Sequence, residues 1–116
     1  TGRDYTGEQV LITSGVSGGL FLALLTLVDD GDEVIIPDPY FVMYKHLVNL
    51  FGGKPVYLDT YDTGFGIDAA RLEKLITPKT RLLLLNSPGN PTGRIFPKRE
   101  LEAIAKVCAK HGITII

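Results

Sequence analysis

The sequence has little of what marks several classes of protein. It contains no tryptophan and a single cysteine, Cys108, so it can form no internal disulfide and has no cysteine pair for a metal site. Cys108 falls in the apolar stripe of an expected helix, which predicts a small core residue rather than a nucleophile. A protein without disulfides is expected in a reducing compartment, here the cytoplasm.

An excess of charge of one sign and long hydrophobic runs are also missing. Twelve basic and 13 acidic residues give a net charge of −1 and are mixed along the chain, so no basic run favours nucleic acid as a partner. The longest apolar runs fall far below the roughly 20 residues of a membrane span. With 116 residues, 45% of them hydrophobic, the chain is the size of one domain with its own core.

Short β-branched or leucine-rich runs alternate with helical patterns along the chain. Strands are expected at 9–13, 33–36, 55–58, 80–85 and 113–116, and helices from 18 or 19 to 29 and at 40–51, 68–77 and 97–111. The first helix is apolar all round, which predicts burial on more than one side. This alternation predicts an α/β fold of three layers, a mainly parallel sheet with helices on both faces.

The stretch 86–93 follows the leucine-rich strand and is built from Asn, Ser, Pro, Gly and Thr. Two prolines and two glycines in six residues favour a rigid turn, and the bonds before Pro88 and Pro91 are candidates for the cis form. The turn presents Asn90 at the carboxyl end of the strand, where ligands bind in open α/β sheets. An ordinary surface turn is the alternative, with Asn86 satisfying the turn itself and Arg94 solvated.

Three stretches in this order resemble the class I/II aminotransferases, the fold-type-I enzymes that use pyridoxal phosphate. They are Ile-Thr-Ser-Gly-Val-Ser-Gly-Gly-Leu at 12–20, Pro-Asp-Pro-Tyr-Phe at 37–41 and Asn-Pro-Thr-Gly at 90–93. Three motifs that occur together in the family's order are more specific than any one of them alone. The resemblance is greatest to the aspartate aminotransferase branch. It implies that 1–116 is part of the large, cofactor-binding domain and that the C-terminal half of the family fold is absent.

A Gly/Ser loop before a helix offers backbone N–H groups and the positive end of the helix dipole to a phosphate. The resemblance assigns this role, toward the cofactor phosphate, to Gly15, Val16 and Ser17. The family usually has Glu or Gln at the next position, where this chain has Gly18. An ordinary strand-to-helix turn is the alternative for the bare pattern.

The resemblance also assigns contacts to the cofactor ring. Phe41 corresponds to the aromatic residue that stacks on the ring, with Tyr40 beside it, and a core role in the following helix is the alternative for Phe41. Asn90 corresponds to the hydrogen-bond donor to the phenolic oxygen. Cofactor binding is therefore expected at Gly15, Val16, Ser17, Phe41 and Asn90.

The implied activity of the parent protein is transfer of an amino group between an amino acid and a 2-oxo acid, in a homodimer. In the family, the lysine that forms the Schiff base, the Asp at the pyridine nitrogen and the Arg that binds the substrate carboxylate follow the strand with which this chain ends. No catalytic residue is therefore expected here, and the fragment alone is expected to be inactive. His46 and His111 lack sequence neighbours that would make them bases or metal ligands.

Three other functions remain compatible with parts of the pattern. A fold-type-I lyase or synthase shares the motifs, and an aminotransferase-like domain of a transcriptional regulator would share the fold. The third is a dinucleotide-binding α/β domain, although the chain lacks the Gly-x-Gly-x-x-Gly loop that such a domain uses.

Overall fold

The computed structural model describes residues 2–116 and contains a parallel sheet of four strands. The strands follow the order β2-β1-β3-β4 across the sheet. Their bounds are β1, Glu33–Asp38; β2, Lys54–Asp59; β3, Thr80–Leu83; and β4, Thr114–Ile115. Four of the five expected strands are thus confirmed, and all pairings are parallel as expected.

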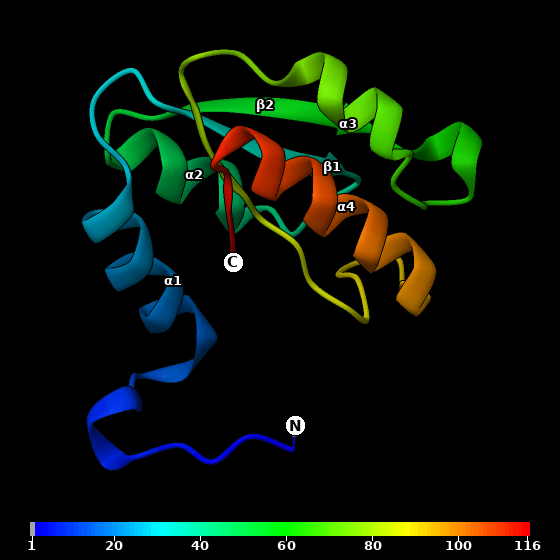
Figure 1. Ribbon diagram of the computed structural model, residues 1–116. Coiled ribbons are helices and arrows are strands. Elements are labelled where there is room, and N and C mark those ends of the chain that lie inside the picture. Colours follow the sequence, from blue (N-terminus) through cyan, green and yellow to red (C-terminus); the bar gives the residue numbers. More distant parts are fainter. Residues whose placement is uncertain (1) are drawn as a thin grey trace.

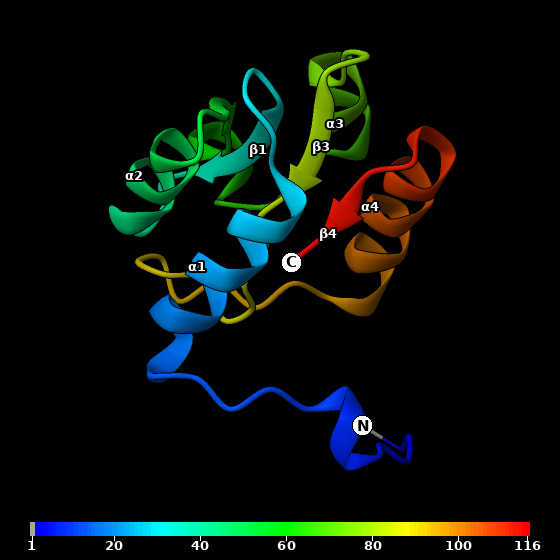
Figure 2. The ribbon, with the colours of Figure 1, turned by 90° about the vertical axis from the view of Figure 1, so that its left-hand side faces the viewer.

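Helices cover both faces of the sheet, which confirms the three-layer expectation (Figure 1). They are α1, Gly15–Leu27; α2, Met43–Leu50; α3, Ala69–Leu75; and α4, Lys98–His111, with short 3-10 turns η1 at Gly7–Gln9 and η2 at Tyr61–Thr63. Figure 2 shows α1 and α2 on one side of the strands and α4 on the other. None of the helices in 2–116 has the length and apolar character needed to cross the bilayer.

The alternation of side chains along the strands divides the core into two clusters. Side chains of successive strand residues point to opposite faces of a sheet. One cluster, on the side of α3 and α4, holds Ile35, Leu72, Leu83, Ile104 and Cys108. The other, on the side of α1 and α2, holds Leu24, Val34, Ile36, Val48 and Leu82. The prediction that Cys108 is a core residue is confirmed, since it is buried, and burial raises the pKa of its thiol.

The prediction of a strand at 9–13 is wrong. These residues form no strand, and the side chain of Ile12 is 93% exposed. A β-branched run becomes a strand only where a neighbouring strand satisfies its backbone groups, and none does so within 2–116. The helix that follows begins at Gly15, before the expected start.

Helix α1 is buried along one side rather than several. Leu24 is fully buried, whereas Phe21, Leu22 and Leu25 on the same helix are exposed. The other face of the sheet is covered by α3 and α4, and within residues 2–116 the buried side of α1 packs on the sheet and on the end of α2. The helix therefore has more apolar side chains than residues 2–116 bury.

Helix α3 is short and is capped by Asp68, the first residue of the expected helix at 68–77. The Asp68 carboxylate accepts hydrogen bonds from the backbone N–H of Ala70 at 2.8 Å and of Arg71 at 3.3 Å. We expect Asp68→Ala to lower the free energy of unfolding by about 1 kcal/mol, because these donors lose their partner. Urea denaturation measures the loss. Asp68→Asn keeps an acceptor and should stay near wild type, and an unchanged Asp68→Ala would show that the cap contributes nothing.

Candidate functional site

The direction in which successive strands are added to the sheet reverses at β1. The chain passes from β1 through α2 to β2 on one side, and then through α3 to β3 on the other side of β1. Because α2 and α3 lie on opposite faces of the sheet, a crevice is expected at the carboxyl ends of β1 and β3.

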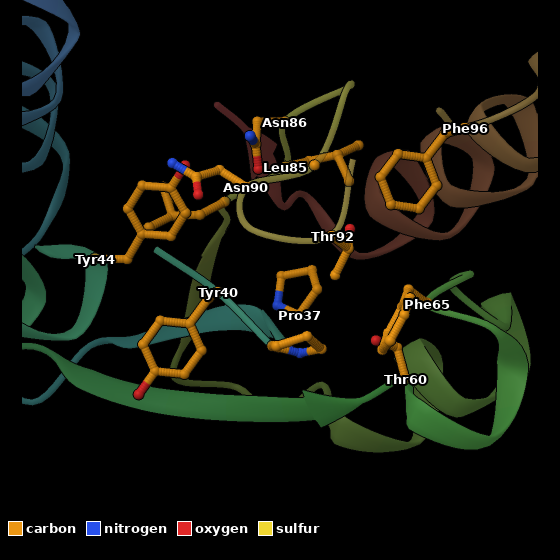
Figure 3. Close-up of a pocket in the computed structure, with 13 residues that line it drawn as sticks. Pro37, Tyr40, Tyr44, Thr60, Phe65, Leu85, Asn86, Asn90, Thr92 and Phe96 are labelled. Carbon is orange, nitrogen blue, oxygen red and sulfur yellow. The ribbon is translucent and has the colours of Figure 1, made fainter. Parts of the chain in front are cut away.

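A pocket lies at that position, and we call it the switch-point pocket (Figure 3). It combines aromatic rings with amide and hydroxyl groups, as small-molecule sites do. Its lining residues come from the end of β1, from the start of α2, from the loop after β2 and from the segment 84–96 after β3. They are Pro37, Pro39, Tyr40, Tyr44, Thr60, Phe65, Leu84, Leu85, Asn86, Gly89, Asn90, Thr92 and Phe96.

Aromatic rings form one wall of the pocket. Tyr40 stacks on Tyr57 with ring centroids 5.3 Å apart and planes 11° from parallel. Tyr44 also lines the pocket, and burial raises the pKa of its phenol, which favours the protonated form. Phe41 does not line the pocket. Its ring lies edge-on to Tyr44 with centroids 5.8 Å apart, one residue removed from the cavity.

The turn at 86–93 is closed by its own hydrogen bonds. The Gly89 N–H donates to the Arg94 carbonyl at 2.7 Å, and the Asn86 amide donates to the Pro88 carbonyl at 3.0 Å, as expected for a turn that Asn86 satisfies. A Cβ on Gly89 would lie 2.8 Å from the Thr92 hydroxyl, so a larger residue there would force the Thr92 side chain to shift. The bonds before Pro88 and Pro91 are cis as predicted, and so is the bond before Pro39, which was not predicted.

This closed turn presents Asn90 to the pocket. Asn90 lines the switch-point pocket and is exposed. Its side-chain amide makes no hydrogen bond to any of residues 2–116. The amide is therefore available as a donor to a ligand in the pocket.

The start of α1 presents unpartnered backbone donors. The Gly15 N–H is held by the Thr13 carbonyl at 2.9 Å, and the Ser14 side chain makes no cap hydrogen bond. The N–H groups of Val16 and Ser17 lie in the first turn and have no intrahelical partner. They sit at the positive end of the helix dipole, a suitable position for an anion.

The start of α1 adjoins the switch-point pocket. Val16 and Leu20 line a second hollow whose other residues are Tyr44, Leu84, Leu85, Asn86 and Ile116. Tyr44, Leu84, Leu85 and Asn86 line both hollows. The fold thus brings the stretches 12–20, 37–41 and 90–93 together at one edge of the sheet, with Phe41 behind Tyr44. The chemistry of these donors and rings fits a flat, phosphorylated cofactor such as pyridoxal phosphate.

Other groups lie apart from this edge. No lysine lines either hollow in the described part of the chain, and residues 2–116 contain no cluster of His, Cys, Asp or Glu that could hold a metal ion. His111 has a partner that its sequence neighbours did not reveal. Its Nε2 lies 2.8 Å from the Glu73 carboxylate, and His111 and then Lys110 lower the pKa of Glu73.

Some site features were missed by sequence reasoning. The expectation that Arg94 is solvated is wrong, because the first turn of α4 brings the Glu100 carboxylate within 2.8 Å of its guanidinium. Thr60 and Phe65 line the pocket from the loop after β2, a segment in which no site residue was expected. Tyr44 could have been found, since it lies four residues after Tyr40 and such spacing places two side chains near one another on a helix.

The order of the strands and the position of the pocket define an α/β domain with a pocket at the switch point of a parallel sheet. The chain belongs to the aminotransferase class I and II family, which matches residues 2–116. This excludes the dinucleotide-binding alternative.

Relatives and solved structures agree with this family. The chain is 42% identical to an aspartate aminotransferase of Geobacillus stearothermophilus over 116 residues, covering 99% of this chain and 30% of the relative. It is 43% identical to aromatic-amino-acid aminotransferase 2 of Thermococcus litoralis over 109 residues, covering 93% of this chain and 28% of the relative. A Thermus thermophilus aspartate aminotransferase mutant superimposes with a TM-score of 0.92 at 40% identity, covering 96% of this chain and 31% of that one. The chain therefore spans less than a third of the length of these relatives.

Proposed function

We propose that this chain forms the cofactor-binding part of the large domain of a pyridoxal-phosphate-dependent aminotransferase. The parent protein would transfer an amino group between an amino acid and a 2-oxo acid. The observation that carries this proposal is the meeting of the start of α1, the Tyr40–Tyr44 segment and the Asn90 turn at the switch point. Family membership over 2–116 supports the same reaction class.

Each part of the site would make a different contact. The backbone N–H groups of Val16 and Ser17, with Gly15 at a φ of +70°, would hold the phosphate. The Asn90 amide would donate to the phenolic oxygen of the ring. Phe41 packs against Tyr44 in this structure. It would stack on the cofactor ring after a side-chain movement that brings it, in place of Tyr44, to the pocket. Pyridoxal phosphate, when bound, supplies an electron sink for carbanion chemistry.

The remaining groups of the reaction would come from outside 1–116. These are the lysine that binds the cofactor covalently, the carboxylate at the pyridine nitrogen and the substrate-binding arginine. We infer by family likeness that the whole protein is a cytoplasmic homodimer and that this chain alone does not catalyse transamination.

Titration of this chain with pyridoxal phosphate, followed by cofactor absorbance and equilibrium dialysis, tests the proposal. We expect saturable, non-covalent binding, with the Kd about tenfold higher in Asn90→Ala because one ligand hydrogen bond is lost. Phe41→Ala should also weaken binding. Asn49→Ala is the matched control, because Asn49 lies exposed on α2, and it should bind like wild type.

Two results would contradict the proposal. One is a folded chain that binds no pyridoxal phosphate at millimolar concentration, and the other is an unchanged Kd in Asn90→Ala. Borohydride reduction and intact mass provide a separate check on the lysine. A stoichiometric adduct at one lysine would show that the covalent residue lies within this chain.

A further inference from the structure

A partly buried ion pair lies behind the switch-point pocket. The Arg94 Nη2 is 2.8 Å from the Glu100 Oε2, and the side chains are 31% and 14% exposed. The other carboxylate oxygen of Glu100 accepts a hydrogen bond from the Ile67 N–H. A Cβ at Gly66 would lie 2.8 Å from the Arg94 Nη2, so a glycine is needed for the guanidinium to approach. We call Gly66, Ile67, Arg94 and Glu100 the Arg94 clamp.

On one side, the clamp holds the turn that carries Asn90. The Arg94 carbonyl accepts the Gly89 N–H at 2.7 Å, and Gly89 directly precedes Asn90. The Arg94 guanidinium lies over the ring of Phe96 at 5.8 Å from its centroid, and Phe96 lines the pocket. Fixing Arg94 by its side chain therefore fixes the backbone acceptor on which the Asn90 turn closes.

On the other side, the clamp holds the loop after β2. The Thr63 hydroxyl donates to the Gly66 carbonyl at 2.6 Å, and the Phe65 N–H donates to the Thr60 carbonyl at 2.9 Å. Phe65 has a φ of +65°, a conformation that a non-glycine residue keeps only when its surroundings impose it. Thr60 and Phe65 line the pocket. The clamp thus joins two pocket walls that are far apart in the sequence.

We propose that Arg94 and Glu100 are positioning residues that fix the Asn90 turn against the 60–67 loop and so set the affinity of the pocket for pyridoxal phosphate. This proposal rests on the proposed function. Removing one partner of a partly buried pair leaves the other charge without its partner. In Arg94→Ala, Glu100 would lose the cation that fixes its carboxylate, which weakens the hydrogen bond that it accepts from the Ile67 N–H, and the turn would lose its attachment to the loop.

The structure also indicates which property of Arg94 matters. Only its Nη2 contacts Glu100, while its buried Nε has no hydrogen-bond partner among residues 2–116. A single charged donor at this position therefore makes the whole ion-pair contact. Arg94→Lys supplies such a donor without the orphaned Nε, and we expect it to restore what Arg94→Ala loses.

Amide hydrogen exchange measured by NMR on this chain without cofactor tests the clamp directly. In Arg94→Ala we expect exchange at Gly89 and Ile67 to become about tenfold faster. The amide of Ile104, fully buried in α4, reports global opening and should change less. Arg94→Lys and Glu100→Gln test the charge, with Lys near wild type and Gln intermediate. Arg99→Ala is the matched control, since Arg99 lines the open hollow beside the clamp and forms no ion pair within 2–116.

Titration of the same variants with pyridoxal phosphate completes the test. We expect Kd to rise severalfold in Arg94→Ala, to recover in Arg94→Lys and to stay unchanged in Arg99→Ala. Equal acceleration at Gly89, Ile67 and Ile104, or none, would overturn the clamp. If wild type binds no pyridoxal phosphate, the proposed function fails and the affinity claim with it. A wild type that binds, with Arg94→Ala unchanged in exchange and in Kd, would overturn the clamp alone.

Discussion

Replacing Ile35 with alanine is expected to lower the free energy of unfolding by about 2–5 kcal/mol, because it leaves a cavity in a close-packed core. Ile35 is fully buried in β1, which lies between β2 and β3 in the sheet. It is paired with Val56 on one side and Leu83 on the other, so both neighbouring strands restrict any collapse into the cavity. Chemical denaturation of wild type and Ile35→Ala measures the loss.

Ile12→Ala is the matched control for this experiment. The same atoms are removed, but Ile12 is 93% exposed and contributes little burial. We expect the free energy of unfolding to change by no more than about 0.5 kcal/mol. A loss at Ile12 as large as that at Ile35 would show that the 9–13 segment packs as a strand in solution, as its sequence pattern predicted.

The contrast between these two isoleucines shows what a sequence pattern can determine. Both lie in β-branched runs, and the runs predict strands equally well. A strand also needs a neighbour that satisfies its backbone groups, and the identity of that neighbour depends on the topology of the whole sheet. For 33–36 the neighbours are β2 and β3. For 9–13 no neighbouring strand lies within the described residues, so the pattern alone could not decide the outcome.

The candidate site divides in the same way. Local backbone signals were sufficient for the Asn90 turn, because prolines and glycines act through adjacent residues, but they placed the start of α1 at 18 or 19 instead of Gly15. Contacts between the segment after β3 and the loop after β2 could not be predicted, because they depend on how two separate strand connections cross the sheet. Arg94 and Glu100 are close in the sequence, but their partner Ile67 belongs to the loop after β2. Phe65 reaches the pocket only because that loop folds back over the end of β1, where Thr60 donates to the Asp38 carbonyl at 2.7 Å.

The pair Gly52-Gly53 shows how one local signal can hide two physical roles. The sequence predicts a glycine cap after the second helix, and Gly52 fulfils this with a φ of +75°. Gly53 lacks a positive φ and is buried between α1 and α2. A Cβ at Gly53 would lie 2.8 Å from the Val28 Cγ1, 3.0 Å from the Val48 Cγ1 and 3.2 Å from the Val48 carbonyl oxygen. Its role is therefore to let two helix ends pack closely.

Gly53→Ala is consequently expected to lower the free energy of unfolding by about 1–3 kcal/mol through overpacking. Val28 and Val48 are stiff, buried side chains, so they cannot yield without shifting the end of α1 relative to α2. Gly7→Ala is the control, since a Cβ there would meet no atom within 4 Å. It should leave stability unchanged or raise it slightly by restricting the unfolded chain. If denaturation midpoints showed Gly53→Ala to be as stable as Gly7→Ala, the close packing of α1 on α2 would be absent in solution, and with it the placement of the Val16 and Ser17 donors beside the pocket.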